Sequence, residues 1–283
     1  MFSLQELLKK IEEAIQDPEG LSEDDGFHIL QGKDYPNAVK RFVVGLVYAL
    51  KDHVIDSDEV TYLEIWRKKF SPDEPIDYEH LNLIRREYLL KHLTKKHIPD
   101  ANKINALREI VVHFKSRPEE VLPYLIESFE LAPTGSELKV ESAMAIGEFG
   151  CLAGAAIIPL LMSLEHRHES GDKKAVYDYQ YAAALSLGKI GGRCLLNHLL
   201  PLLYRSDRQK YLATVALSTM NPSKLVEISD QRFPFFLEDY KMALKKVVET
   251  ANEESNSAIM SYAQTALRNF EKFFKENQNQ SRH

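Results

Sequence analysis

The chain has 283 residues, of which 44% are hydrophobic and 28% are charged, and its formal net charge is −6 at pH 7. This composition is ordinary for a folded protein; it excludes extended disorder, and the negative charge argues against general nucleic-acid binding. The sequence has neither a signal-peptide-like stretch nor a run near ~18 apolar residues, so we expect a cytoplasmic protein. Two cysteines, Cys151 and Cys194, have no ligand-like neighbours and are expected to be small buried side chains.

Residues 1–100 predict an N-terminal helical segment. Ser3 and Glu6 have the spacing of a capping box, and a helix with one apolar stripe follows them. The apolar spacing predicts further helices over residues 36–52, 60–70 and 81–98. The helix over residues 60–70 carries Val60, Leu63, Ile65, Trp66 and Phe70.

A tight acidic turn, residues 52–59, precedes that helix. Asp56 or Ser57 fits an N-cap, and Asp58 and Glu59 fit the first turn, where negative charge suits the helix dipole. A calcium loop fits less well, because its required glycine and distal glutamate are absent. This helix–acidic turn–helix resembles the TerB-type helical domain of tellurite resistance, a likeness that implies no particular function.

The helix that ends before Pro99 is basic on the side expected to face solvent. The basic residues on this side are Arg85, Arg86, Lys91, His92, Lys95, Lys96 and His97. Such a face is either simply solvated or forms a patch for phosphate or an acidic partner. Aromatic residues do not alternate with these charges, which argues against single-stranded nucleic acid as the ligand.

Two copies of one pattern organise residues 140–203. The copies span residues 143–150 and 184–191; each runs through small and apolar residues to a glycine, a polar residue, an apolar residue and a second glycine. An apolar pentad containing a proline follows each copy. Gly147 and Gly188 lie 41 positions apart (188 − 147), and Pro159 and Pro201 lie 42 apart (201 − 159). A period of about 40 is typical of helix pairs that stack into a solenoid.

This run, followed by apolar-Pro-apolar-apolar, resembles the HEAT repeat and its phycobilisome-lyase-type variant. More degenerate copies lie at residues 106–125 and 213–222, and the resemblance covers roughly residues 101–274. It implies an all-α fold in which a right-handed α-α superhelix over residues 101–276 follows the N-terminal segment. Residues 277–283 are expected to be a frayed polar tail.

The repeat pattern also predicts local structure. Small residues in the first helix of each expected pair allow a neighbouring helix to approach closely. Gly150 and Gly191 follow the last apolar residue, where a left-handed C-terminal cap is expected. Pro159 and Pro201 are expected early in the second helix, where the missing N–H is least unfavourable.

In HEAT-like solenoids the second helix of each pair lines the concave surface, so polar residues on those helices are the candidate binding residues. They are Glu119, Glu120, Glu127, Glu130, Glu165, His166, Asn197, His198 and Arg205. The acidic members favour a basic partner. The loop after Glu165 also contains His168, but a zinc site there needs a third strong ligand from elsewhere, so we interpret the loop as solvated.

The sequence shows no Gly-rich phosphate loop, nucleophile elbow or catalytic triad spacing. We therefore expect no enzyme activity, no cofactor and no metal. The favoured function is a noncatalytic protein-binding scaffold or adaptor that uses the concave face to hold another, preferably basic, protein. The alternative is a nucleic-acid-binding or DNA-repair-type HEAT-like protein that uses Arg85, Arg86, Lys95 and Lys96.

Overall fold

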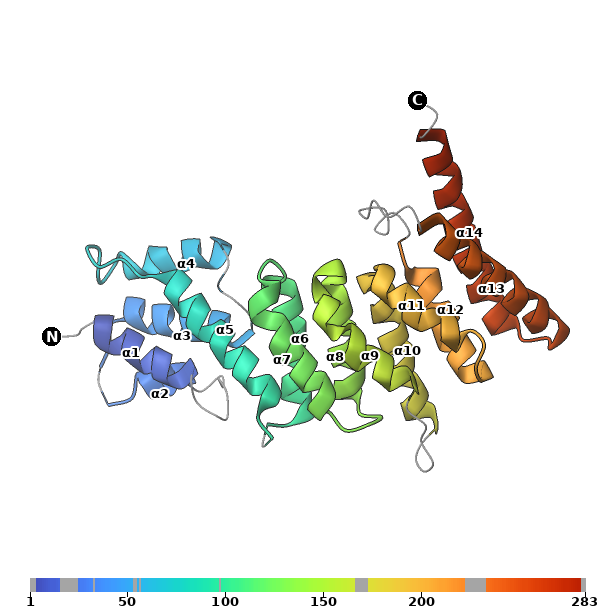
Figure 1. The fold of residues 1–283 in the computed structure, drawn as a ribbon. Coiled ribbons are helices and arrows are strands. Elements are labelled where there is room, and N and C mark those ends of the chain that lie inside the picture. Colours follow the sequence, from blue (N-terminus) through green and yellow to red (C-terminus); the bar gives the residue numbers. More distant parts are fainter. Residues whose placement is uncertain are drawn as a thin grey trace. The chain divides into compact units, whose positions relative to one another are not determined.

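The computed structural model is an assembly of helices (Figure 1). It describes residues 4–15, 25–32, 34–52, 55, 57–96, 98–165, 173–221 and 233–280. These ranges contain fourteen α-helices, one 3-10 helix and no β-strand, which confirms the predicted all-α class. The chain divides into two compact units, Met1–Phe114 and Lys115–His283. The domain boundary predicted at residue 100 stays a prediction.

The first unit is built around an apolar core. Its helices are α1 (Leu4–Ile15), α2 (Asp25–Ile29), α3 (Asn37–Asp52), α4 (Ser57–Arg67), α5 (Tyr78–Thr94) and α6 (Asp100–His113). In α1, Leu4, Leu7, Ile11 and Ile15 recur every three or four residues and are all buried, so one face of the helix packs against α2, α3 and α5. α3 packs against α2 and α4, and α5 packs against α6.

The acidic turn begins α4 as the sequence predicts, with Asp58 and Glu59 in the first helical turn. Leu63 is buried in this helix, whereas the side chain of Ile65 is 53% exposed. Two residues turn an α-helix by about 200°, so Leu63 and Ile65 point in nearly opposite directions.

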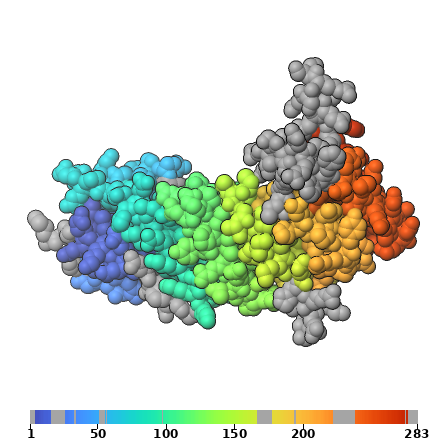
Figure 2. All heavy atoms as spheres, viewed as in Figure 1, coloured from blue at the N-terminus to red at the C-terminus, as the bar shows by residue number. Residues whose placement is uncertain are grey.

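The second unit is a series of helices that follow one another in space as they do in sequence. They are α7 (Pro118–Leu131), α8 (Glu137–Glu148), the 3-10 helix η1 (Gly150–Ala156), α9 (Ile157–Glu165), α10 (Lys173–Ile190), α11 (Arg193–Leu202), α12 (Asp207–Thr219), α13 (Phe233–Glu253) and α14 (Ser257–Gln280). The spheres of residues 115–221 change from green to orange in this order (Figure 2).

The helices of the second unit form two kinds of contact. α8 packs extensively against α10, α10 against α12, and α12 against α14; we call these four helices the stacked layer. Each helix of the stacked layer also packs against the helix before it in the pairs α7/α8, α9/α10, α11/α12 and α13/α14. No comparably extensive packing joins α7 to α9, or α9 to α11, among the described residues.

This pairing differs by one helix from the predicted one. The sequence pattern pairs residues 137–148 with the helix after them, whereas in the structure α9 packs mainly against α10, and α8 is paired with α7. Likewise α6, expected to pair with α7, packs against α5 in the first unit. The second helix of each pair is therefore the one rich in small residues, which form a helix surface that both neighbours can approach.

The two repeat glycines lie where the helices of the stacked layer meet. A methyl group on Gly147 of α8 would lie 2.6 Å from Oγ and 2.9 Å from Cα of Ser186 on α10. On Gly188 of α10 it would overlap Thr219 and lie 2.5 Å from the carbonyl oxygen of Ala216 on α12. The predicted close approach at both glycines is confirmed, and any larger residue would push the helices apart.

The glycine caps are also confirmed, because Gly150 has φ 55° and Gly191 has φ 66°. Pro159 is the third residue of α9, as predicted, but Pro201 is the penultimate residue of α11. The early position predicted for Pro201 is therefore wrong. The residues before Pro159 form the 3-10 helix η1, whereas the equivalent residues before Pro201 are already α-helical, so α11 starts earlier relative to its proline.

The last two helices pack against each other and, through α14, against α12. In this pair Tyr240 of α13 stacks on Phe270 of α14, with ring centroids 6.5 Å apart and planes at 17°. α14 continues to Gln280, past the start of the polar tail expected from residue 277. Cys151, in η1, is exposed rather than buried as expected.

Candidate binding surface

The open face of the stacked layer is narrow. Along residues 177–190 of α10, the only side chains that are not buried are Tyr177, Asp178, Tyr181, Leu185 and Lys189. Their three- and four-residue spacing places them on one face of the helix. The other faces of α10 pack against α8, α9 and α12. Along residues 177–190, a partner can therefore reach α10 only on this stripe.

Tyrosines from three neighbouring helices of the stacked layer, α10, α12 and α14, meet on this face. The ring of Tyr181 (α10) stacks on that of Tyr211 (α12), with centroids 6.4 Å apart and planes at 18°. Tyr211 contacts Tyr262 (α14) edge to face at 5.6 Å, and the hydroxyl oxygens of Tyr181 and Tyr262 are 3.0 Å apart. These residues come together only because α10, α12 and α14 are stacked.

Tyr177 extends the group by one helical turn, and its side chain is 43% exposed. We call Tyr177, Tyr181, Tyr211 and Tyr262 the tyrosine cluster. The guanidinium carbon of Arg208 lies 4.6 Å from the ring centroid of Tyr177. Nε and Nη2 of Arg208 are buried and make no hydrogen bond within the described part of the chain, so the ring face of Tyr177 is a principal contact of this cation.

Two hydroxyls of the cluster, those of Tyr181 and Tyr211, have raised pKa values. The hydrogen bond with Tyr262, together with burial, raises the pKa of Tyr181 to about 12. Burial, together with the neighbouring Tyr262, raises the pKa of Tyr211. At neutral pH these two hydroxyls can therefore both donate and accept hydrogen bonds, and their rings offer an apolar surface.

An ion-pair group lies between α8 and α10 in the same layer. Glu148 of α8 contacts Nζ of Lys189 at 2.6 Å and Nζ of Lys115 at 3.5 Å. The hydrogen bond from Lys189 is the main reason why the pKa of Glu148 is lowered. Both lysines are already paired with Glu148, so we do not assign these three residues a binding role.

The acidic residues predicted as binding residues on the first of the pairs lie on α7, outside the stacked layer. Glu119, Glu127 and Glu130 are exposed there, and Glu120 is half-buried. Glu120 lies 3.5 Å from Nη1 of Arg117. The three exposed carboxylates form one stripe along α7.

Of the remaining predicted residues, Glu165 ends α9, Asn197 and His198 lie on α11, and Arg205 lies between α11 and α12. Glu165, Asn197, His198 and Arg205 are all exposed. The structure brings two of them together, because Nη1 of Arg205 lies 3.0 Å from a carboxylate oxygen of Glu165. His166 lies outside the described residues. This set is therefore spread over helices that do not pack extensively against one another.

The basic set proposed for nucleic acid is less exposed than predicted. Arg85 is only 4% exposed and lies 3.4 Å from a carboxylate oxygen of Glu109 on α6, so its placement on a solvent-facing side is wrong. Arg86 is half-buried, with its guanidinium 6.0 Å from the ring centroid of Phe114. Of the other two, Lys95 is half-buried and Lys96 is exposed.

His92 was expected on the same basic face and is also buried, with Nε2 3.1 Å from the hydroxyl of Tyr88. The basic residues of α5 are spaced so that some lie on the inner side of the helix and others on the outer side. A long basic side chain can bury its stem, so charge alone did not identify the exposed side.

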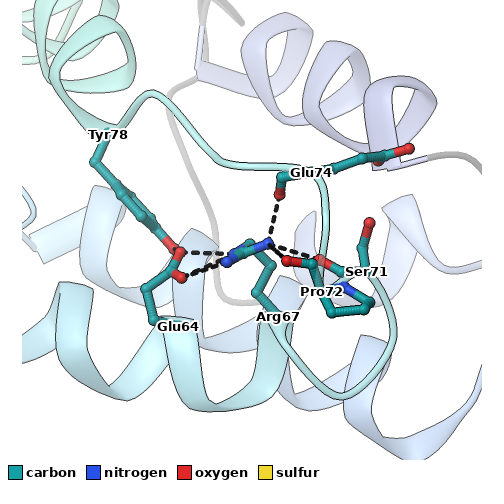
Figure 3. Close-up of polar contacts among 6 residues, drawn as sticks. All are labelled: Glu64, Arg67, Ser71, Pro72, Glu74 and Tyr78. Atoms are coloured by element: carbon teal, nitrogen blue, oxygen red, sulfur yellow. Dashed lines mark hydrogen bonds and ion pairs between the residues drawn. The ribbon is translucent and has the colours of Figure 1, made fainter.

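The densest polar group of the first unit surrounds Arg67 (Figure 3). Its guanidinium contacts the carboxylate of Glu64 at 2.7–2.9 Å and donates to the carbonyl oxygens of Ser71 (2.6 Å), Pro72 (3.3 Å) and Glu74 (2.5 Å). The Tyr78 hydroxyl donates to Glu64 at 3.0 Å.

This group holds the chain between α4 and α5, and Arg67 at its centre is only 5% exposed. The hydrogen bond from Arg67 is the main cause that lowers the pKa of Glu64, while burial and Glu64 raise the pKa of Tyr78. We therefore assign it a structural role.

Among the described residues, no group of three or more His, Cys, Asp or Glu side chains is placed to hold a metal ion. The loop with His166 and His168 lies outside those residues. None of the described helices is both long and apolar enough to cross a membrane. Comparisons of the chain with protein-family models, with curated proteins and with solved structures found no match.

Proposed function

We propose that this chain is a noncatalytic protein-binding scaffold, and that residues 115–283 form a HEAT-like solenoid that binds its partner through the open face of the stacked layer. The observation that carries the proposal is the tyrosine cluster with Arg208. Tyrosine and arginine are the residue types over-represented in protein-interface hot spots. Tyrosine also contributes a large rigid contact area with a polar end.

The packing supports the stacked layer as the inner face of the solenoid. In a curved two-layer array, neighbours on the inner side are closer together than neighbours on the outer side. α8, α10, α12 and α14 pack extensively in series, whereas α7, α9 and α11 do not among the described residues. This moves the proposed site from α7, α9 and α11 to the second helix of each pair as the structure defines the pairs.

The chemistry of this face favours a partner segment with basic residues. Asp178 follows Tyr177 in α10 and Asp207 lies one turn before Tyr211 in α12; both are exposed, and Asp207 also lies 3.1 Å from Nζ of Lys210. An arginine or lysine of the partner can place its charge near these carboxylates and its stem or cation against a tyrosine ring. The exposed carboxylates of α7 form a local negative stripe in the same unit, which favours encounter with a basic protein.

The nucleic-acid alternative has weaker support. Glu109 already neutralises Arg85, and Arg86 packs against Phe114. A phosphate-binding surface needs several exposed cations in one patch, because each contact releases a counterion. Lys95 and Lys96 alone supply too few exposed cations for such a surface.

The test is an affinity pull-down from the native cell extract, with and without nuclease, repeated with Tyr177→Ala, which removes an exposed ring. We expect a stoichiometric protein that survives nuclease and that Tyr177→Ala retains about tenfold less well. Met162→Ala on α9 is the matched control, because Met162 is exposed but lies outside the stacked layer. Recovery of nucleic acid alone, or equal retention by Tyr177→Ala and the intact chain, would overturn the proposal.

A further inference from the structure

An open groove of about 740 Å³ lies in the first unit, among α2, α3 and α4. Three aromatic side chains line it and remain largely exposed: Phe27 of α2 (63%), Tyr48 of α3 (59%) and Tyr62 of α4 (48%). Its volume lies within the range of about 300–1,000 Å³ found for ligand sites in proteins. Soluble proteins seldom leave such aromatic residues side by side in solvent without a binding role.

Helix α3 forms the floor of the groove, and one position of this floor is a glycine. Val44 and Gly45 lie midway along the lining, and Gly45 presents no side chain. A methyl group at Gly45 would already lie 3.3 Å from the ring of Tyr62. The glycine therefore lets the Tyr62 ring lie close against α3, and the exposed rings of Phe27, Tyr48 and Tyr62 supply the apolar surface for an incoming side chain.

The two ends of the groove carry opposite charges. Asp58 and Glu59 line the end at the beginning of α4. Lys40 and Arg41 line the other end, near the last turn of α4, because the guanidinium of Arg41 lies 4.6 Å from the ring centroid of Trp66. The groove is thus apolar in its middle, negative at one end and positive at the other.

We propose that this groove binds an amphipathic α-helix of a partner protein. A helix carries a partial positive charge at its N-terminus and a partial negative charge at its C-terminus. Its dipole complements both ends when the N-terminus lies near Asp58 and Glu59 and the C-terminus near Lys40 and Arg41. The bound helix then runs parallel to α4.

The length of the groove sets the size of the recognised segment. From Arg41 to Tyr48 the floor spans seven residues, or about 10 Å of helix. This accommodates two turns, so the partner helix presents about three apolar side chains at i, i+3 or i+4, and i+7, as in other helix-in-groove complexes. This site lies in the other unit from the tyrosine cluster and does not rest on the function proposed for it.

The chain provides its own reporter for the test, because Trp66 is its single tryptophan. Trp66 contacts Arg41 of the groove, and Tyr62 lies edge-on to it at 6.3 Å. The probe is a tryptophan-free, end-capped and hydrocarbon-stapled model helix of about nine residues, so that both of its termini can lie at the ends of the groove, with leucines at i, i+3, i+4 and i+7 and neutral polar residues elsewhere. We expect a saturable change in Trp66 fluorescence, with Kd below about 100 µM.

Variants of exposed residues locate the binding without disturbing the fold. Phe27→Ala and Tyr48→Ala should each raise the Kd at least tenfold, and Lys40→Glu about threefold through its effect on the helix C-terminus. Ile65→Ala is the matched control and should change the Kd less than twofold, because Ile65 is an exposed apolar residue of α4 that does not line the groove.

Three results would overturn the inference. They are no saturable binding of the leucine helix, equal binding of a scrambled peptide that is not amphipathic, or equal binding by Phe27→Ala and Tyr48→Ala. A concentration-dependent dimer that Tyr48→Ala dissociates, measured by sedimentation without peptide, would assign the groove to a second copy of this chain instead.

Discussion

The two units differ in the polar side chains that they bury. Among the described residues, those buried in the first unit are cationic or titratable: Arg67, Arg85, His92 and Lys103. Those buried in the second unit are all uncharged: Ser128, Ser142, Ser163, Gln180, Ser186, Gln209 and Thr214. The first unit thus relies on specific partners for buried charge, and the second on short hydrogen bonds at helix contacts.

Ser186 shows how the second unit satisfies its buried groups. Its hydroxyl donates to the carbonyl oxygen of Ala143 at 2.7 Å, directly beside the contact with Gly147. Gln180 donates to the carbonyl oxygen of Ser163 at 2.6 Å, which links α10 to α9. Small uncharged donors of this kind can be repeated from pair to pair without burying a charge, which suits a stacked architecture.

The largest effect should come from the buried cation of the first unit. Arg67→Met leaves the Glu64 carboxylate and three carbonyl oxygens without their donor, and we expect it to lower the free energy of unfolding by about 3–5 kcal/mol. Urea denaturation followed by Trp66 fluorescence measures this unit. Lys91→Met breaks the pair with Glu87 on α5, in which both side chains are more than half exposed, and should change stability by less than about 1 kcal/mol. Similar losses for the two variants would contradict the structural role of Arg67.

A smaller effect should come from the helix contacts of the second unit. Gly188→Ala introduces a methyl group that overlaps Thr219 and should lower the free energy of unfolding by about 1–3 kcal/mol. Gly154→Ala is the control, because a methyl group there meets nothing within 4 Å. Urea denaturation followed by circular dichroism measures both. A Gly188→Ala variant as stable as Gly154→Ala would show that α10 and α12 are not in close contact.

The smallest effects should appear in acid. The lowered pKa values of Glu64 and Glu148 mean that each carboxylate stabilises the fold above its unfolded pKa, near 4.5, and that this stability is lost as pH falls through the folded pKa. Glu64→Gln should therefore reduce stability at pH 7, and below pH 4.5 the stability of this variant should fall less steeply with decreasing pH than that of the intact chain. Glu148→Gln should do the same more weakly, because the Glu148 side chain is 40% exposed and that of Glu64 25%. Denaturation of both variants at pH 7, 4.5 and 3 tests this. If stability fell with pH as steeply in the variants as in the intact chain, the lowered pKa values of Glu64 and Glu148 would be contradicted.

Much of the second unit could be predicted from its sequence because its rules are local. The positive φ of Gly150 and Gly191 and the close approach at Gly147 and Gly188 follow from residue size and position within one repeat. The pairing of helices could not be predicted in this way, since α8 precedes one apolar helix and follows another. Only the contacts show that it packs with α7.

The candidate site depends on contacts that no local pattern shows. Tyr181 and Tyr262 are 81 positions apart in the sequence. They meet only because α10, α12 and α14 are stacked. The sequence signal for this site was the alternation of Tyr177, Tyr179 and Tyr181. In the structure Tyr179 is buried and the other two lie on the open face. In the first unit, the burial of Arg85 depends on Glu109 from the next helix, which α5 alone does not reveal.

Site-specific photocrosslinking tests the central claim most directly. A photoreactive phenylalanine analogue would replace either Tyr177, in the tyrosine cluster, or Met162, on α9, and the chain would be irradiated in its native cells. The scaffold account predicts a protein adduct from position 177 and none from position 162. An adduct from position 162 alone would contradict it, because the partner would then lie against α9 and its neighbours rather than against the stacked layer.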